Sequence, residues 1–159
     1  MALDTKKLTS IDWAIVGGAL IVFIALFLPW FGFHGGDAIL PSVSGWSSGF
    51  TGWFGGLLLV AAGVYLFLLR SQANLPKVSV GPGVLVLGLA ALGLLLVIIR
   101  WVTLPRSGIY QYGAKYGIYV ALVAGIAEVV GAAMLFRSSG EALPWAGHGA
   151  DGSSTPPSA

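Results

Sequence analysis

The chain has 159 residues, of which 57% are hydrophobic and 9% are charged, and its mean hydropathy is +0.89. Soluble domains carry roughly 25% charged residues, so this composition predicts a membrane protein. The net charge of +2 is too small and too scattered along the chain to indicate nucleic-acid binding. Cysteine is absent from the sequence, which excludes disulfides, thiolate metal sites and cysteine chemistry.

Four apolar stretches follow one another, each close to the roughly 20 residues that a helix needs to cross about 30 Å of hydrocarbon. They cover residues 11–31, 50–69, 78–99 and 116–136. We therefore expect an all-α integral membrane protein with four transmembrane helices in an antiparallel bundle, formed by residues 1–137. Residues 138–159 are rich in Gly, Ser, Pro and Ala and have no apolar periodicity, so we expect a disordered cytoplasmic tail.

Local signals indicate where some of these helices begin and end. Thr9 or Ser10 is expected to cap the first helix, with Asp12 favourably placed in its first turn. Pro82 falls in the first turns of the third stretch, where a missing N–H does little harm. Pro29 falls near the exit of the first stretch, which we expect to end soon after it.

The basic residues near the span ends predict the orientation of the chain. One side carries Lys6, Lys7, Arg70, Lys77 and Arg137, and the other side carries Arg100, Arg106 and Lys115. The first apolar stretch is too long for a signal-peptide core and shows no A-x-A-like cleavage site, so we expect it to be retained. The side with more basic residues is expected to be cytoplasmic, which places both termini inside and the protein in the plasma (inner) membrane.

Aromatic side chains gather in the two predicted outer loops. They are Trp30, Trp46, Trp53, Trp101, Tyr110, Tyr112 and Tyr116. Indole and phenol rings favour the headgroup level of a bilayer, so an interfacial belt is the simplest interpretation. Arg100, Arg106 and Lys115 lie close to Trp101 and the tyrosines of the second loop, and this combination suits anionic lipid headgroups. Membrane lipids are therefore expected partners, with plain anchoring as the alternative.

The first outer loop also contains the motif "HGGD", with His34 and Asp37. Two metal ligands in a glycine-rich loop without a third candidate nearby do not make a metal site. We therefore predict neither a metal nor another cofactor.

Glu128 is a single carboxylate in the middle of the last apolar stretch, "ALVAGIAEVVGAAML". At about 100° per residue it shares one helix face with small residues, namely Gly117, Ala121, Ala124, Gly125, Gly131 and Ala132. Small residues let helix backbones approach closely in lipid, so this face is expected to meet protein and the bulky opposite face to meet acyl chains. An ionised, unpaired carboxylate near the midplane costs at least a few kcal/mol, so Glu128 must be protonated, hydrogen-bonded or matched by a cation. Tyr65 is the nearest candidate partner by depth, with backbone carbonyls and another subunit equally open.

Three classes of function compete for this feature. In the first, the protein is a non-enzymatic structural or accessory subunit in which Glu128 and the small face dock helices. In the second, it is a small oligomeric transporter or channel that uses Glu128 as a proton or cation site. An enzyme is disfavoured, because Tyr65 and Tyr119 are the only other titratable groups deep in the spans and no catalytic motif occurs. We prefer the accessory class, because a transport pathway normally shows several polar residues spread through the membrane. The expected partner is a larger membrane complex or a homo-oligomer.

The run "FLPWFGF", the outer loop ending "SVSGWSSGFTGW" and the following "FGGLLLVAAG" resemble small four-span membrane proteins of actinobacteria, most of which have no assigned function. The likeness covers the first two spans best, and the second pair matches as generic Gly/Ala-rich spans. Some small four-span proteins of mycobacteria are accessory subunits of envelope machines, including lipid importers of the mammalian-cell-entry type. The resemblance implies a similar accessory role linked to lipid or envelope transport, and it brings no catalytic residue.

Overall fold

The computed structural model describes residues 8–34, 42–71, 80–104 and 111–141. Four helices and three short strands occur in the order α1 (Ser10–Ala25), β1 (Pro29–His34), β2 (Val43–Ser44), α2 (Phe50–Arg70), α3 (Pro82–Val102), β3 (Gln111–Ala114) and α4 (Tyr116–Ser139). Three of the helices, α2, α3 and α4, are long and apolar enough to cross a membrane, and α1 is a shorter apolar helix. The prediction of an apolar helical bundle is confirmed, and a small sheet is added to it.

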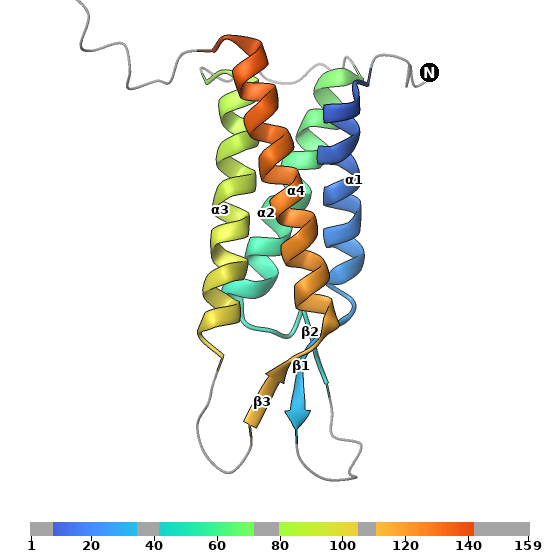
Figure 1. Cartoon of the computed structure of the whole chain (residues 1–159), viewed down its shortest axis with the longest axis vertical. Coiled ribbons are helices and arrows are strands. Elements are labelled where there is room, and N and C mark those ends of the chain that lie inside the picture. Colours follow the sequence, from blue (N-terminus) through green and yellow to red (C-terminus); the bar gives the residue numbers. More distant parts are fainter. Residues whose placement is uncertain (1–7, 35–41, 72–79, 105–110, 142–159) are drawn as a thin grey trace, which may run out of the picture.

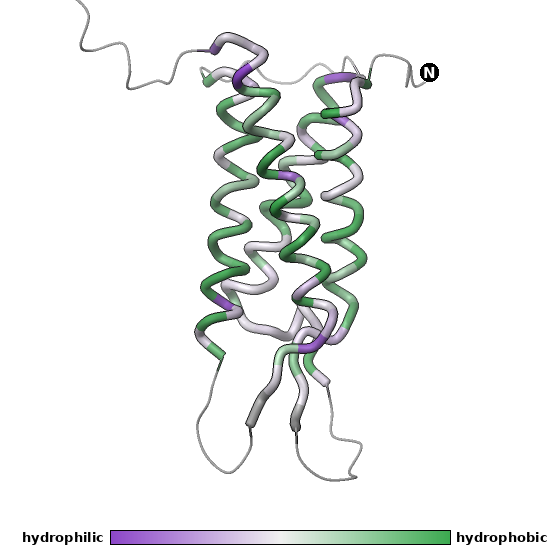
Figure 2. Tube along the Cα trace, in the orientation of Figure 1, coloured by the Kyte–Doolittle hydropathy of each residue, from purple (hydrophilic) through white to green (hydrophobic). Residues whose placement is uncertain are grey.

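The four helices stand side by side and alternate in direction along the chain (Figure 1). Helices α1 and α3 each pack against both α2 and α4, whereas α2 and α4 lie across the bundle from each other with little contact. The start of α1 and the end of α4 lie at one end of the bundle, and the strands lie at the other (Figure 1). Hydrophobic residues run along every helix, while hydrophilic residues gather mainly towards the two ends (Figure 2).

Glycines allow the helices to approach closely. Gly55 of α2 and Gly93 of α3 face each other, and a Cβ atom added to either would lie 2.9 or 2.8 Å from the carbonyl oxygen of the other. Gly63 of α2 lies against Ala19 of α1, where a Cβ would overlap the alanine methyl group. Such close crossings are typical of helix packing in lipid. The larger core side chains around them include Ile15, Val22, Leu59, Leu66, Val86 and Val97.

The cap that the sequence predicts for the first helix is confirmed. The Thr9 hydroxyl accepts a hydrogen bond from the backbone N–H of Asp12, and the Asp12 carboxylate accepts one from the backbone N–H of Thr9. This reciprocal capping box satisfies two donors that the start of a helix otherwise leaves free. Pro82 is at the first position of α3, where its missing N–H has no helical partner to lose.

The first helix is shorter than predicted, because it ends at Ala25 and not near residue 31. Pro29 has no N–H and disfavours a helical conformation in the residue before it, so the chain leaves the helix and continues as β1. The indole N–H of Trp30 donates a hydrogen bond of 2.7 Å to the carbonyl of Ala25, which also accepts one of 3.1 Å from the backbone N–H of Leu28. The assignment of Trp30 to an interfacial belt is therefore wrong: its side chain is fully buried and closes the strand end of the core.

The three strands form an antiparallel sheet in the order β2-β1-β3. The pairing of β1 with β3 runs from Phe31 opposite Ala114 to His34 opposite Gln111. β1 also pairs with β2, with a register irregularity between Pro29 and Phe31. The sequence predicts no strand here, because "PWFGFH" is apolar and continues the hydropathy of α1 without a break.

The later boundaries also differ in detail from the prediction. α2 matches the predicted stretch within one residue, whereas α3 begins four residues and ends three residues later than 78–99. α4 continues to Ser139 and is followed by Gly140 in the left-handed conformation, with φ of 65°. The first residues of the predicted tail, 138–141, therefore belong to the folded part, and residues 142–159 lie outside the described residues.

Candidate functional site

Glu128 lies midway along α4, on the face that this helix turns towards the other helices. Every small residue that the sequence places on this face is buried: Gly117, Ala121, Ala124, Gly125, Gly131 and Ala132. The opposite face is exposed, with Val123 at 69% and Ile126 at 52% of full accessibility. The helical spacing thus predicts correctly which face of α4 packs against protein.

The small residues of this face contact several parts of the fold. Gly125 faces Leu59 of α2 and Leu94 of α3, and Gly131 faces Ile15 of α1. Gly117 lies beneath the start of β1. The face therefore joins α4 to all three other helices and to the sheet, with Glu128 at its centre.

Glu128 itself lies at the seam between α4 and α1. The nearest part of α1 is Gly18, where an added Cβ would lie 3.3 Å from the Cβ of Glu128 and 3.2 Å from the carbonyl oxygen of Ala124. The Glu128 side chain is fully buried, and neither carboxylate oxygen has a hydrogen-bond partner among the described residues. A glycine at position 18 leaves just enough room for this close contact.

Tyr65, the partner suggested by depth, is not hydrogen-bonded to Glu128 in the described part of the chain. It is half-buried on α2 and packs against the apolar core. Because α2 and α4 lie across the bundle from each other, α1 and α3 separate most of their lengths. The structure therefore leaves the carboxylate without the donor that the sequence suggested. The glycine that packs against Glu128 is Gly18 of α1, which the sequence alone does not single out.

The basic residues predicted to contact lipid headgroups do not form one cluster among the described residues. The guanidinium of Arg100 lies 5.2 Å from the centre of the Phe31 ring, and the stem of Lys115 crosses β1 at Gly32. Phe31 and Gly32 are consecutive strand residues and so point to opposite faces of the sheet, which separates the two cations. Trp101 is 39% exposed and meets Tyr119 edge-on, as expected of an interfacial ring. Arg106 lies outside the described residues, and lipid binding by this set stays a prediction.

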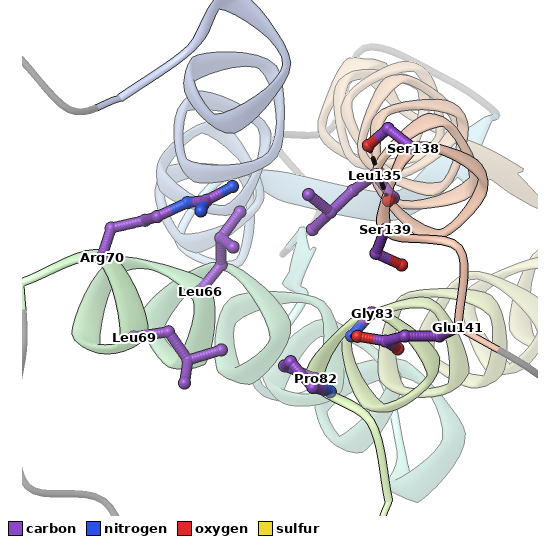
Figure 3. Close-up of a pocket in the computed structure, with 9 residues that line it drawn as sticks. All are labelled: Leu66, Leu69, Arg70, Pro82, Gly83, Leu135, Ser138, Ser139 and Glu141. Carbon is purple, nitrogen blue, oxygen red and sulfur yellow. Dashed lines mark hydrogen bonds between the residues drawn. The ribbon is translucent and has the colours of Figure 1, made fainter.

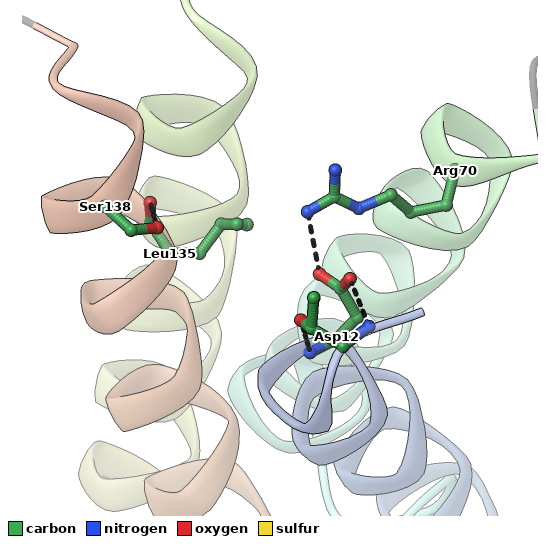
Figure 4. A network of polar contacts seen from close by, with 5 residues as sticks. Asp12, Arg70, Leu135 and Ser138 are labelled. Atoms are coloured by element: carbon green, nitrogen blue, oxygen red, sulfur yellow. Dashed lines mark hydrogen bonds and ion pairs between the residues drawn. The ribbon is translucent and has the colours of Figure 1, made fainter. Parts of the chain in front are cut away.

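An ion pair that the sequence does not reveal lies at the other end of the bundle. Arg70, at the end of α2, donates to the Asp12 carboxylate of α1 at 3.0 Å (Figure 4). Asp12 is fully buried, while the Arg70 side chain is 39% exposed. The sequence marks Asp12 only as a first-turn residue and Arg70 only as a topology signal, because 58 positions separate the two.

A second polar contact closes the same end of the bundle. Past Gly140 the chain turns, and Glu141 lies beside Gly83 at the start of α3 (Figure 3). The Glu141 carboxylate accepts hydrogen bonds from the backbone N–H groups of Gly83 at 3.3 Å and Val84 at 3.1 Å. Because α3 has no side-chain cap of its own, Glu141 serves as that cap, and its negative charge suits the positive end of the helix dipole. Beside it lies a cavity of about 390 Å³, lined in part by Arg70 and Ser139.

Within the described residues, no three His, Asp or Glu side chains come together as a metal site would require. Comparison with protein-family models, with curated proteins and with solved structures finds no match to this chain. Its function is therefore inferred from its own geometry.

Proposed function

We propose that all four helices cross the plasma (inner) membrane, with both termini in the cytoplasm and the sheet outside. Arg70 and Arg137 lie at the end of the bundle where α1 starts and α4 ends, and the lysines at positions 6, 7 and 77 belong to the same side by sequence. This is the more basic side, which favours a cytoplasmic location. α1 has 16 residues and rises about 24 Å, and the apolar residues Leu26 and Phe27 directly after it extend this length.

Within that membrane, we propose that the protein is a non-enzymatic structural or accessory subunit that docks a transmembrane helix of a larger complex. The observation that carries this proposal is an apolar groove of about 570 Å³ between α1 and α4. Half of the ten residues that line it are small and come from both helices, namely Ala14, Gly17, Gly18, Ala124 and Ala127. The other five are Trp13, Ile21, Tyr119, Val120 and Val123. Exposed small residues let another helix backbone approach closely in lipid, where tight packing drives association.

A second groove, between α1 and α2, fits a partner helix less well. Its volume is about 360 Å³, and two of its eight lining residues, Ala19 and Gly63, are small. Fewer small residues leave a partner backbone fewer points of close approach. The α1–α4 groove is therefore the better docking surface.

The buried polar groups support a role without catalysis or conduction. Asp12, Ser48 and Glu128 are the buried polar or charged side chains of the described residues. Asp12 and Ser48 lie near opposite ends of the bundle and Glu128 at its middle, so no two converge as a catalytic site requires. A transport pathway would need polar steps between these levels, and apolar core residues occupy them. We infer from the resemblance noted above that the larger complex acts in lipid or envelope transport.

The test is affinity purification from the native membrane in gentle detergent, comparing Gly17→Leu with Gly88→Leu. Both glycines are in helices, and a Cβ at either would have no atom within 4 Å, so both variants should fold. Gly17 lines the groove, whereas Gly88 lies on the exposed side of α3.

We expect wild type and Gly88→Leu to retain a stoichiometric membrane-protein partner and Gly17→Leu to lose it. Equal recovery of the partner with both variants would contradict docking in the groove. A lone oligomer that conducts in liposomes would contradict the accessory function and favour a transporter.

A further inference from the structure

Glu128 differs from the other buried polar side chains of the described residues. The Ser48 hydroxyl donates to the carbonyl of Gly45 at 2.6 Å. The Asp12 carboxylate accepts hydrogen bonds from Thr9 and Arg70. Glu128 is as deeply buried as these two, and both of its oxygens lack a partner. A buried polar group without a partner requires a physical explanation.

No described cation stands at the level of Glu128. The charged residue of α1 is Asp12, an anion, and α2 carries Arg70, which lies at the end of the bundle and binds Asp12. α3 carries Arg100, which packs against Phe31 near the sheet. α4 carries Arg137, nine residues and so about 13 Å along the helix from Glu128.

The described tyrosines do not supply a partner for Glu128 either. Tyr65 of α2 packs into the apolar core without a bond to Glu128, and Tyr116 and Tyr119 on α4 are exposed near its first turn. α3 has no titratable residue between Pro82 and Ile99. The described surroundings of the carboxyl group are therefore apolar side chains and helix backbone.

We propose that Glu128 is a proton-binding site, held as a neutral carboxylic acid while the seam between α1 and α4 is closed. An unpaired charge is costly at the centre of a membrane helix. This cost raises the ratio of neutral acid to carboxylate by about a hundredfold or more relative to water. When the seam opens and water enters, the acid passes its proton to water and becomes a carboxylate. Closure of the seam takes a proton back from hydronium and releases water.

The geometry at Gly18 links this proton to the surface of the bundle. Gly18 packs closely against the backbone of Ala124 and the Cβ of Glu128, and both Gly18 and Ala124 also line the groove on the outer side of the seam. Water that reaches Glu128 from the groove passes between these two residues, so loss of the proton by this route deforms the floor of the groove. Only this link rests on the proposed docking function, and the proton site stands without it.

The test is infrared spectroscopy of the full chain, purified and reconstituted in lipid, as the pH is raised. The sequence has two glutamates, Glu128 and Glu141, so ¹³C-glutamate labelling of the variant Glu141→Gln leaves Glu128 as the one labelled glutamate carboxyl. We expect the carbonyl stretch of a protonated acid at about pH 5.5, where a free glutamate is ionised, shifted by the label and absent from Glu128→Gln. Carboxylate bands from the labelled group at about pH 5.5 would overturn the proposal.

A second measurement does not depend on the labelled variant. The folded bundle is expected to bind one proton more than the unfolded chain at pH values above the range in which a free glutamate ionises. In that pH range, the ratio of folded to unfolded protein should fall about tenfold for each unit by which the pH is raised. Wild type should show this slope and Glu128→Gln should lack it, while equal slopes would overturn the proposal. Both measurements use the isolated chain, so failure of Gly17→Leu to release a partner would leave them untouched.

Discussion

Replacing Asp12 by asparagine is expected to lower the free energy of unfolding by about 1 to 2 kcal/mol. The carboxylate accepts the backbone N–H of Thr9 at 3.0 Å and the Arg70 guanidinium at 3.0 Å, and it lies in the first turn of α1. The neutral amide weakens the capping bond and loses the attraction to the helix dipole, about 0.3–1 kcal/mol. The ion pair adds about 0.5–1 kcal/mol, because the Arg70 side chain is 39% exposed and therefore partly screened by water.

The assay is a double-mutant cycle with Asp12→Asn, Arg70→Gln and the double variant. Unfolding is followed by tryptophan fluorescence and circular dichroism in mixed detergent micelles. We expect a coupling energy of about 0.5–1 kcal/mol between the two sites. Thr9→Ala serves as the matched control, because it removes the other half of the capping box, worth about 1 kcal/mol, and leaves the ion pair in place. If Asp12→Asn were as stable as wild type, the cap and the ion pair would not stabilise the bundle as described.

Three further predictions concern the ends of the bundle and its orientation. Glu141→Ala should lower the stability by about 1 kcal/mol, because two N–H groups at the start of α3 lose their acceptor; an unchanged melting temperature would contradict this cap. Trp30→Phe should cost about 2 kcal/mol through the lost indole bond and the space left behind, and a loss below about 0.5 kcal/mol would show that the ring does not seal the core. Alkaline-phosphatase fusions should be active at Leu40 and inactive at Asn74 and at the C-terminus, and an active C-terminal fusion would reverse the topology.

The helices and the packing face of α4 could be predicted because both depend on local periodicity. Four apolar stretches of the right length identify the helices, and the spacing of small residues around Glu128 identifies the buried face of α4. The end of α1 at Ala25 could not be predicted from periodicity. A hydropathy pattern does not distinguish an apolar residue facing lipid from one buried under a sheet, so the residues from Leu26 to Phe31 looked like more helix.

The long-range polar contacts could not be predicted from the sequence for a different reason. Asp12 bonds to Arg70 across 58 positions, and Glu141 bonds to Val84 across 57. Each residue alone has an ordinary interpretation as a helix-end charge or a tail residue. Which pairs meet depends on the order of the helices around the bundle, and that order is set by close contacts such as Gly55 with Gly93.

The most direct test of the proposed function is site-specific photo-crosslinking in intact cells from Val123, on the rim of the α1–α4 groove, and from Leu92, on α3. Both side chains are exposed, at 69% and 48%, and only Val123 lines the groove. The proposed function predicts a discrete adduct with a different membrane protein from position 123 and none from position 92. An adduct of twice the 16.4 kDa mass of this chain would assign the groove to a second copy. That result, or the same adducts from both positions, would contradict docking of a larger partner in the groove.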